Sequence, residues 1–157
     1  MTGITRRGFT LVEMVVVVAI VGILAAAAHP VLELSQRRAR ELELRQALRT
    51  LRGAIDAYKR AADERRIQVA ADASGYPPRL EVLVDGVPDL RAKDKRLFFL
   101  RRLPRDPFAD ASLPAAQTWA LRSYDSPPDA PAPGRDVFDV ASRSDRVGLD
   151  GTRLHDW

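Results

Sequence analysis

One carboxylate, Glu13, stands in an apolar run that carries no other charged residue before residue 29. As a helix, a run of about 20 residues spans roughly 30 Å, which is the thickness of a hydrocarbon core. A carboxylate deep in that core costs about 2.5 to 3.5 kcal/mol, so Glu13 is expected to have a cationic partner. A new amino group on Phe9 could serve, and it would exist only after a cut between Gly8 and Phe9.

The residues around this carboxylate form a block that is rare by chance: Arg7-Gly8-Phe9-Thr10-Leu11-Val12-Glu13, followed by an apolar helix and Pro30. The block resembles the class III signal of type IV pilins and type II secretion pseudopilins. The resemblance implies cleavage between Gly8 and Phe9 by a prepilin peptidase, N-methylation of Phe9, and a role for Glu13 in assembly.

Two other interpretations of the apolar run are weaker. An ordinary secretory signal places its cleavage site after an apolar core of about 7 to 15 residues, whereas the candidate cut here precedes the run. A plain single-pass anchor accounts for Arg6 and Arg7 as positive-inside residues. It leaves Glu13 unexplained, because an acid in a simple anchor only raises its insertion cost.

The elements that carry these residues divide the chain into four segments. We predict a leader at 1–8, a transmembrane or filament-core helix at 9–29, an amphipathic continuation at 30–68 and a C-terminal globular region at 69–157. Pro30 should kink or locally unwind the helix, because it removes a backbone donor. In the continuation, apolar residues recur at helical spacing and predict one buried face: Leu44, Leu48, Leu51, Ile55, Tyr58 and Ala62. Two i,i+4 ion pairs are expected on the same helix, Glu41–Arg45 and Asp56–Arg60.

The C-terminal region reads as short elements joined by irregular segments. Gly75-Tyr76-Pro77-Pro78 ends the helical pattern, and a short second helix is predicted at 78–83. Alternating apolar residues predict strands at 118–124 and 137–140, separated by the proline-rich stretch 126–134. The predicted fold is α+β and pilin-like: a long N-terminal α-helix, transmembrane and then amphipathic, packed against a small antiparallel β-sheet.

The order of motifs in this region narrows the resemblance to the major pseudopilin of type II secretion, the G-type. It includes a Leu-Pro-x-Asp-Pro-aromatic block at 103–108, a Phe-Asp-x-x-Ser strand end at 138–142, and an Asp- and Gly-rich loop before a terminal Trp157. The aromatic block continues with Ala109 and Asp110 where the family usually has Gly and then Asn or Tyr. Such departures fit a divergent relative or a minor subunit as well as the typical major one.

The final loop is the candidate for bound chemistry. The resemblance implies a calcium ion held through Ser142, Asp145 and Asp150, with backbone oxygens near Arg143 and Val147, and oxygen donors suit this cation. Arg143 and Arg146 could instead pair with the same carboxylates and replace the ion. The loop does not have the spacing of an EF-hand.

Composition bounds the remaining functions. The formal net charge is only +4 at pH 7 and there is no cysteine, so a polyanion-binding excess and thiolate sites are excluded. Neither histidine, His29 nor His155, is placed beside an evident nucleophile, and we expect no enzyme. Arg101, Arg102 and Arg105 form the one candidate basic cluster, and no nucleic-acid partner is expected.

The sequence thus predicts a structural subunit of a secretion filament in the bacterial inner membrane, single-pass, with its C-terminal domain in the periplasm and no cofactor other than calcium. The resemblance implies these partners: other copies of the chain, minor pseudopilins, the prepilin peptidase, and an inner-membrane assembly platform with its ATPase. The filament would drive export of folded proteins. A type IV pilus or DNA-uptake pilin and a membrane-tethered binding domain are the alternatives.

Overall fold

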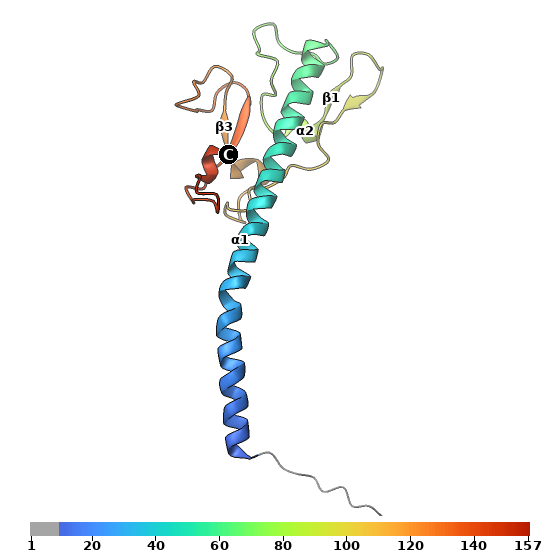
Figure 1. Ribbon diagram of the computed structural model, residues 1–157. Coiled ribbons are helices and arrows are strands. Elements are labelled where there is room, and N and C mark those ends of the chain that lie inside the picture. Colours follow the sequence, from blue (N-terminus) through green and yellow to red (C-terminus); the bar gives the residue numbers. More distant parts are fainter. Residues whose placement is uncertain (1–9) are drawn as a thin grey trace, which may run out of the picture. The chain divides into compact units, whose positions relative to one another are not determined.

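The computed structural model describes residues 10–157, except for the side chains of residues 25–31 (Figure 1). Its first and longest element is α1, Leu11–Asp63. The chain divides into two compact units, one ending at Ala39 and the other comprising Arg40–Trp157. The predicted leader 1–8 and residue Phe9 lie outside the described residues.

The first half of α1 contains the predicted 9–29 helix from Leu11 onward. The helix continues through Pro30, and the kink at that proline stays a prediction. Within the residues whose side chains are described, no helix combines the length and the apolarity needed to cross a membrane.

The C-terminal end of α1 lies at Asp63, five residues before the predicted end at 68. Arg65 adopts a left-handed conformation, with φ of 53°. Its N–H donates to the Ala62 carbonyl, and the Arg66 N–H donates to the Ala61 carbonyl, both at 2.9 Å. This pair of bonds is a Schellman motif, which closes a helix by satisfying its last carbonyls. Helix propensity up to Gln68 did not reveal it, because glycine or asparagine usually occupies the left-handed position.

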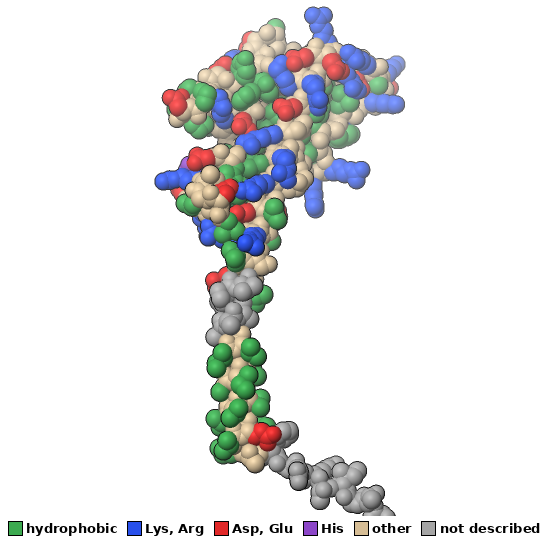
Figure 2. All heavy atoms as spheres, in the orientation of Figure 1, with side chains coloured by type: hydrophobic (Ala, Val, Ile, Leu, Met, Phe, Trp, Pro, Cys, Tyr) green, Lys and Arg blue, Asp and Glu red, His purple; other side chains and the backbone are tan. Residues whose placement is uncertain are grey.

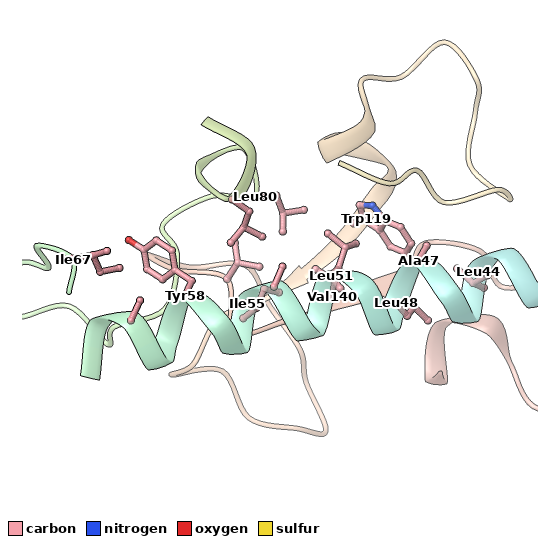
Figure 3. Packing of buried hydrophobic residues seen from close by; sticks show 14 of the residues in the cluster. Leu44, Ala47, Leu48, Leu51, Ile55, Tyr58, Ile67, Leu80, Trp119 and Val140 are labelled. Carbon is pink, nitrogen blue, oxygen red and sulfur yellow. The ribbon is translucent and has the colours of Figure 1, made fainter. Parts of the chain in front are cut away.

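The core of the C-terminal unit forms along the predicted apolar face of α1 (Figure 3). Leu44, Leu51 and Ile55 have no exposed surface, and the predicted Leu48 and Tyr58 are also buried. Ala62 packs against the cluster but is only partly buried. Residues from the rest of the unit cover this face: Ile67, Leu80, Leu83, Trp119, Val137, Val140 and Leu154. Helical periodicity therefore predicted the buried face correctly.

The remaining elements are short. They are α2 (Val82–Asp85), β1 (Val87–Pro88), β2 (Arg96–Leu97), η1 (Ala115–Thr118), β3 (Trp119–Arg122), β4 (Asp139–Ser142) and η2 (Leu154–Asp156). β1 pairs with β2, and β3 pairs with β4, both antiparallel. The α+β, pilin-like prediction is confirmed, with two small sheets in place of one. The short helix predicted at 78–83 begins only at Val82, because the turns before it do not extend into an α-helix.

In the β3–β4 pair, Trp119 lies opposite Ser142 and Arg122 lies opposite Asp139. The buried Trp119 indole donates to the Pro104 carbonyl at 3.0 Å. This bond ties the Leu-Pro-x-Asp-Pro-aromatic block to the start of β3. The block, the strand pair and α1 therefore meet at one buried side chain.

Candidate functional sites at the helix start and in the C-terminal loop

The first turn of α1 is closed by Thr10 and Glu13. The Glu13 backbone N–H donates to the Thr10 hydroxyl at 3.2 Å, and the Met14 N–H donates to the Thr10 carbonyl at 3.2 Å. Thr10 is therefore the N-cap, and Glu13 occupies the third helical position. Thr-x-x-Glu is the sequence signature of a capping box. Glu13 also suits the positive end of the helix dipole, which is a local role that the sequence analysis missed.

The helical segment after this cap exposes apolar side chains. Leu11, Val18 and Ile23 are 80%, 71% and 70% exposed. Figure 2 shows hydrophobic side chains along the visible face of this segment. Apolar side chains in water lose about 25 cal/mol per Å² relative to burial, and an apolar surface of this extent marks a membrane or protein contact.

Ser142, the first predicted calcium ligand, is buried at the end of β4. Its hydroxyl donates to the Asp106 carboxylate at 2.5 Å. Asp106 is also buried, and its other oxygen accepts the Phe108 N–H at 2.8 Å. Ser142 therefore joins β4 to the Leu-Pro-x-Asp-Pro-aromatic block, and its hydroxyl already has a carboxylate partner.

Asp145, the second predicted ligand, is exposed and lies beside η2. Its Oδ1 is 3.2 Å from Nδ1 of His155. The other imidazole nitrogen of His155, Nε2, is 3.1 Å from an Asp156 oxygen. The structure thus places Asp145 next to a histidine that the sequence analysis had not linked to the loop.

Asp150, the third predicted ligand, is held by groups of both the loop and α1. Its Oδ1 accepts the hydroxyl and the N–H of Thr152 at 2.7 and 3.0 Å. Its Oδ2 accepts Nη2 of Arg45 at 2.6 Å. The Thr152 bonds first, and the Arg45 charge after them, hold the pKa of Asp150 below its ordinary value.

Trp157 packs beside Arg45 and Thr152, the two residues that hold Asp150. The Arg45 guanidinium lies 4.1 Å from the centre of the Trp157 ring, and the indole N–H donates to the Thr152 hydroxyl at 2.5 Å. A Cβ at Gly148 would come within 2.6 Å of the ring. Only glycine at position 148 leaves space for the indole against the loop.

Two further side chains of α1 bind the C-terminal segment. The buried Glu41 carboxylate accepts the Leu149 N–H at 3.0 and 3.2 Å. Arg52 pairs with Asp139 at 2.7 Å and donates to the carbonyls of Val140 and Trp157. Sequence reasoning had assigned Glu41 and Arg45 to each other, and the structure shows that both side chains contact the C-terminal loop. The predicted Asp56–Arg60 pair is not among the described ion pairs, and Lys59–Asp63 is the i,i+4 pair on this part of the helix.

The three predicted calcium ligands do not converge. Ser142 points to Asp106, Asp145 lies beside His155, and Asp150 is paired with an arginine. Among the described residues, no group of three His, Cys, Asp or Glu side chains is placed to hold a metal. Calcium needs six to eight oxygens around one point, and this donor set does not fit that requirement.

The arginines that were predicted to replace the ion make other contacts. Arg143 donates to the Trp119 carbonyl at 3.0 Å, and Arg146 lies 5.9 Å from the Phe108 ring centre. In the candidate basic cluster, Arg105 donates to the carbonyls of Leu113 and Asp110. The guanidinium that meets the loop carboxylate is Arg45. Arg45 directly follows the buried Leu44. Its place beside the buried face of α1 was the only sequence signal for a contact with the C-terminal region.

Comparison with known proteins places these features in a family. Residues 5–28 match the model of the prokaryotic N-terminal methylation motif. The type II secretion system core protein G of Escherichia coli K12 is 32% identical over 110 residues, covering 67% of this chain and 68% of that protein. The protein of the same name from Klebsiella pneumoniae is 31% identical over 108 residues, covering 66% and 69%. No solved structure matches the chain. The chain therefore belongs to the type II secretion system core protein G family of type IV pilin-like pseudopilins.

Proposed function

We propose that this chain is a structural, non-catalytic subunit of a type II secretion filament that drives the export of folded proteins. The subunit waits in the inner membrane through the first half of α1, with the C-terminal unit in the periplasm. It is then extracted and stacked with other copies. Membership of the core protein G family supports this role.

The observation that carries the proposal is the exposed apolar surface of α1 from Leu11 to Leu24. In the membrane, lipid would cover these side chains. In a filament, the same segments of neighbouring copies would cover them. Both states remove the apolar surface from water, so a subunit can exchange one for the other at a modest difference in free energy.

Glu13 gives this exchange its register. Cleavage after Gly8 leaves a positive amino group on Phe9, and methylation preserves the charge. In a low-dielectric filament core, an unpaired carboxylate is costly, whereas an acid–amine pair between neighbours satisfies both charges and fixes their axial offset. The Glu13 carboxylate then has two roles, an inter-subunit ion pair and a favourable charge at the positive end of the α1 dipole.

The proposed partners follow from this cycle. A prepilin peptidase removes residues 1–8 and methylates Phe9. An inner-membrane assembly platform with its ATPase lifts the subunit, and minor pseudopilins accompany the growing filament. Intact mass spectrometry of membrane-extracted protein should find a chain that begins at methylated Phe9. Retention of Met1 in a functional subunit would contradict the maturation step.

The ion-pair role of Glu13 can be separated from the cap of α1 by substitution. Glu13→Gln keeps a side chain that suits the capping box but removes the charge, whereas Thr10→Ala removes the cap and keeps the charge. We expect Glu13→Gln and Glu13→Leu to leave cleavage and insertion intact and to reduce filament yield and secretion at least tenfold, as counted by electron microscopy of sheared filaments. Thr10→Ala should assemble nearly normally. Wild-type assembly by Glu13→Leu would refute the register role.

A further inference from the structure

We propose that Arg45 closes the C-terminal loop of this chain in place of a metal ion, so that the unit folds without calcium. The family resemblance implies a calcium ion in this same loop. Its consequence for the filament, assembly without calcium, rests on the proposed function.

The strongest support comes from the surroundings of Asp150. One carboxylate oxygen accepts both Thr152 donors, and the other accepts the Arg45 guanidinium at 2.6 Å. A calcium ion at Asp150 would have to displace Arg45 or lie beside its positive charge. The guanidinium already supplies the positive charge that the carboxylate needs.

Arg45 is also held in position from a second side. The flat guanidinium stacks over the Trp157 ring at 4.1 Å, a geometry that attracts a cation to the ring face. Trp157 is fixed in turn by Thr152 and by the space above Gly148. Arg45, Trp157 and Asp150 thus form one interlocked group, although the Arg45 and Asp150 side chains each keep 41% exposure.

The loop backbone is closed by groups of the chain itself. Glu41 accepts the Leu149 N–H. Within the loop, the Gly148 N–H donates to the Thr152 carbonyl at 2.7 Å and the Leu154 N–H to the Arg146 carbonyl at 2.9 Å. The Ser142 hydroxyl and the Asp145 carboxylate face Asp106 and His155. A cation would have to reorganise several of these contacts to gather ligands.

Thermal unfolding of the full-length protein in non-ionic detergent tests the inference. Unfolding is monitored by tryptophan emission, once in 1 mM calcium and once in excess EDTA. We expect the same midpoint in both conditions. An ion present at a hundredfold its Kd would instead raise the midpoint by roughly 10 °C. A calcium-dependent rise of that kind in the wild type overturns the inference.

Substitution of Arg45 tests the contacts of its guanidinium with Asp150 and Trp157 directly. Arg45→Gln should lower the midpoint by about 2 to 6 °C equally in calcium and in EDTA. It should also increase acrylamide quenching of the tryptophan emission, and this increase would report Trp157, because Trp119 is fully buried. Arg49→Gln is the matched control, because Arg49 lies one turn further on and bonds only Gln46 in the described structure. Adding Asp150→Asn to Arg45→Gln should lower the midpoint little further, because both substitutions remove the same Arg45–Asp150 ion pair.

Equal melting of Arg45→Gln and Arg49→Gln would also overturn the inference. Filament counts with and without chelator provide the link to the proposed function. Filaments that form equally well in EDTA support calcium-free assembly. Failure of the wild type to form filaments in either condition would refute the proposed function, while the melting curves would still decide the role of Arg45.

Discussion

The first half of α1 and the C-terminal unit use apolar residues in opposite ways. From Leu11 to Leu24 the large apolar side chains are exposed, whereas in the C-terminal unit Leu44, Leu51 and Ile55 are fully buried. The helix is continuous across both parts. Leu44, Leu51 and Ile55 therefore lie on the same helix as the exposed residues, and what differs is whether the chain itself supplies the covering side chains. Folding of the single chain buries the apolar core of the C-terminal unit, whereas it leaves the large apolar side chains from Leu11 to Leu24 exposed.

The largest difference in stability between the first half of α1 and the C-terminal unit should come from truncating a buried leucine to alanine. Leu51→Ala should lower the free energy of unfolding of the C-terminal unit by about 2 to 5 kcal/mol, because it leaves a cavity in a packed core. Val18→Ala, at an exposed position, should leave that unfolding unchanged and act on filament yield instead. Chemical denaturation in detergent measures the first effect. An equal loss of stability in both variants would contradict the division.

The next effect concerns the buried polar contact between β4 and the Leu-Pro-x-Asp-Pro-aromatic block. Ser142→Ala removes a hydroxyl from the buried Asp106 carboxylate and should cost about 1 to 3 kcal/mol. The loss should be the same with calcium and with EDTA, because the hydroxyl serves Asp106. A double-mutant cycle with Asp106→Asn should show a coupling above about 0.5 kcal/mol. Strict additivity would show that the contact does not contribute.

The pH dependence of unfolding should report Asp136. Burial acts to raise the pKa of this carboxyl, but hydrogen bonds from Ser74, the Tyr124 N–H and Ser123 overcome it and lower the pKa below its ordinary value of 3.8. A lowered folded-state pKa adds stability above pH 3.8, and that stability is lost as the pH falls through the folded value. Asp136→Asn should therefore flatten the acid limb of the stability curve. An acid limb of unchanged slope in Asp136→Asn would contradict this assignment.

The smallest effect is a gain. Arg65 lies in the left-handed region at the end of α1, which costs a residue with a Cβ about 1 to 2 kcal/mol. Arg65→Gly should raise stability by roughly 0.5 to 1 kcal/mol after the higher chain entropy of glycine is subtracted. Arg60→Gly, inside the last turn of the helix, should lower stability by a similar amount. A loss in both variants would show that the Arg65 side chain has an interaction worth more than its strain.

The parts of this fold that repeat at short range could be predicted from the sequence. Helical periodicity identified the buried face of α1. The alternation of apolar residues predicted the first residues of β3 and β4 to within two positions. The motif at Gly8–Glu13 indicated the family, which the comparisons confirm. The cleavage site, methylation at Phe9 and the role of Glu13 stay predictions.

The contacts that position the loop could not be predicted. Arg45 and Asp150 are 105 residues apart, and Glu41 and Leu149 are 108 apart. Local spacing on a helix favoured Glu41–Arg45 instead, because an i,i+4 pair requires no knowledge of the fold. The fold brings the Leu149 N–H to Glu41 and the second oxygen of Asp150 to Arg45. Such choices depend on tertiary placement, which spacing along the chain does not encode.

The Arg45–Asp150 contact also predicts how sequences should vary among relatives. If one guanidinium stands in for an ion, the residues at these two positions should change together among relatives. We expect homologues with a basic residue at the position of Arg45 to have lost ligands elsewhere in the loop. Homologues with a small or acidic residue there, and the Asp retained, are the ones in which a cation is needed. A single helical position would then sort the family into two groups by how each closes the same loop.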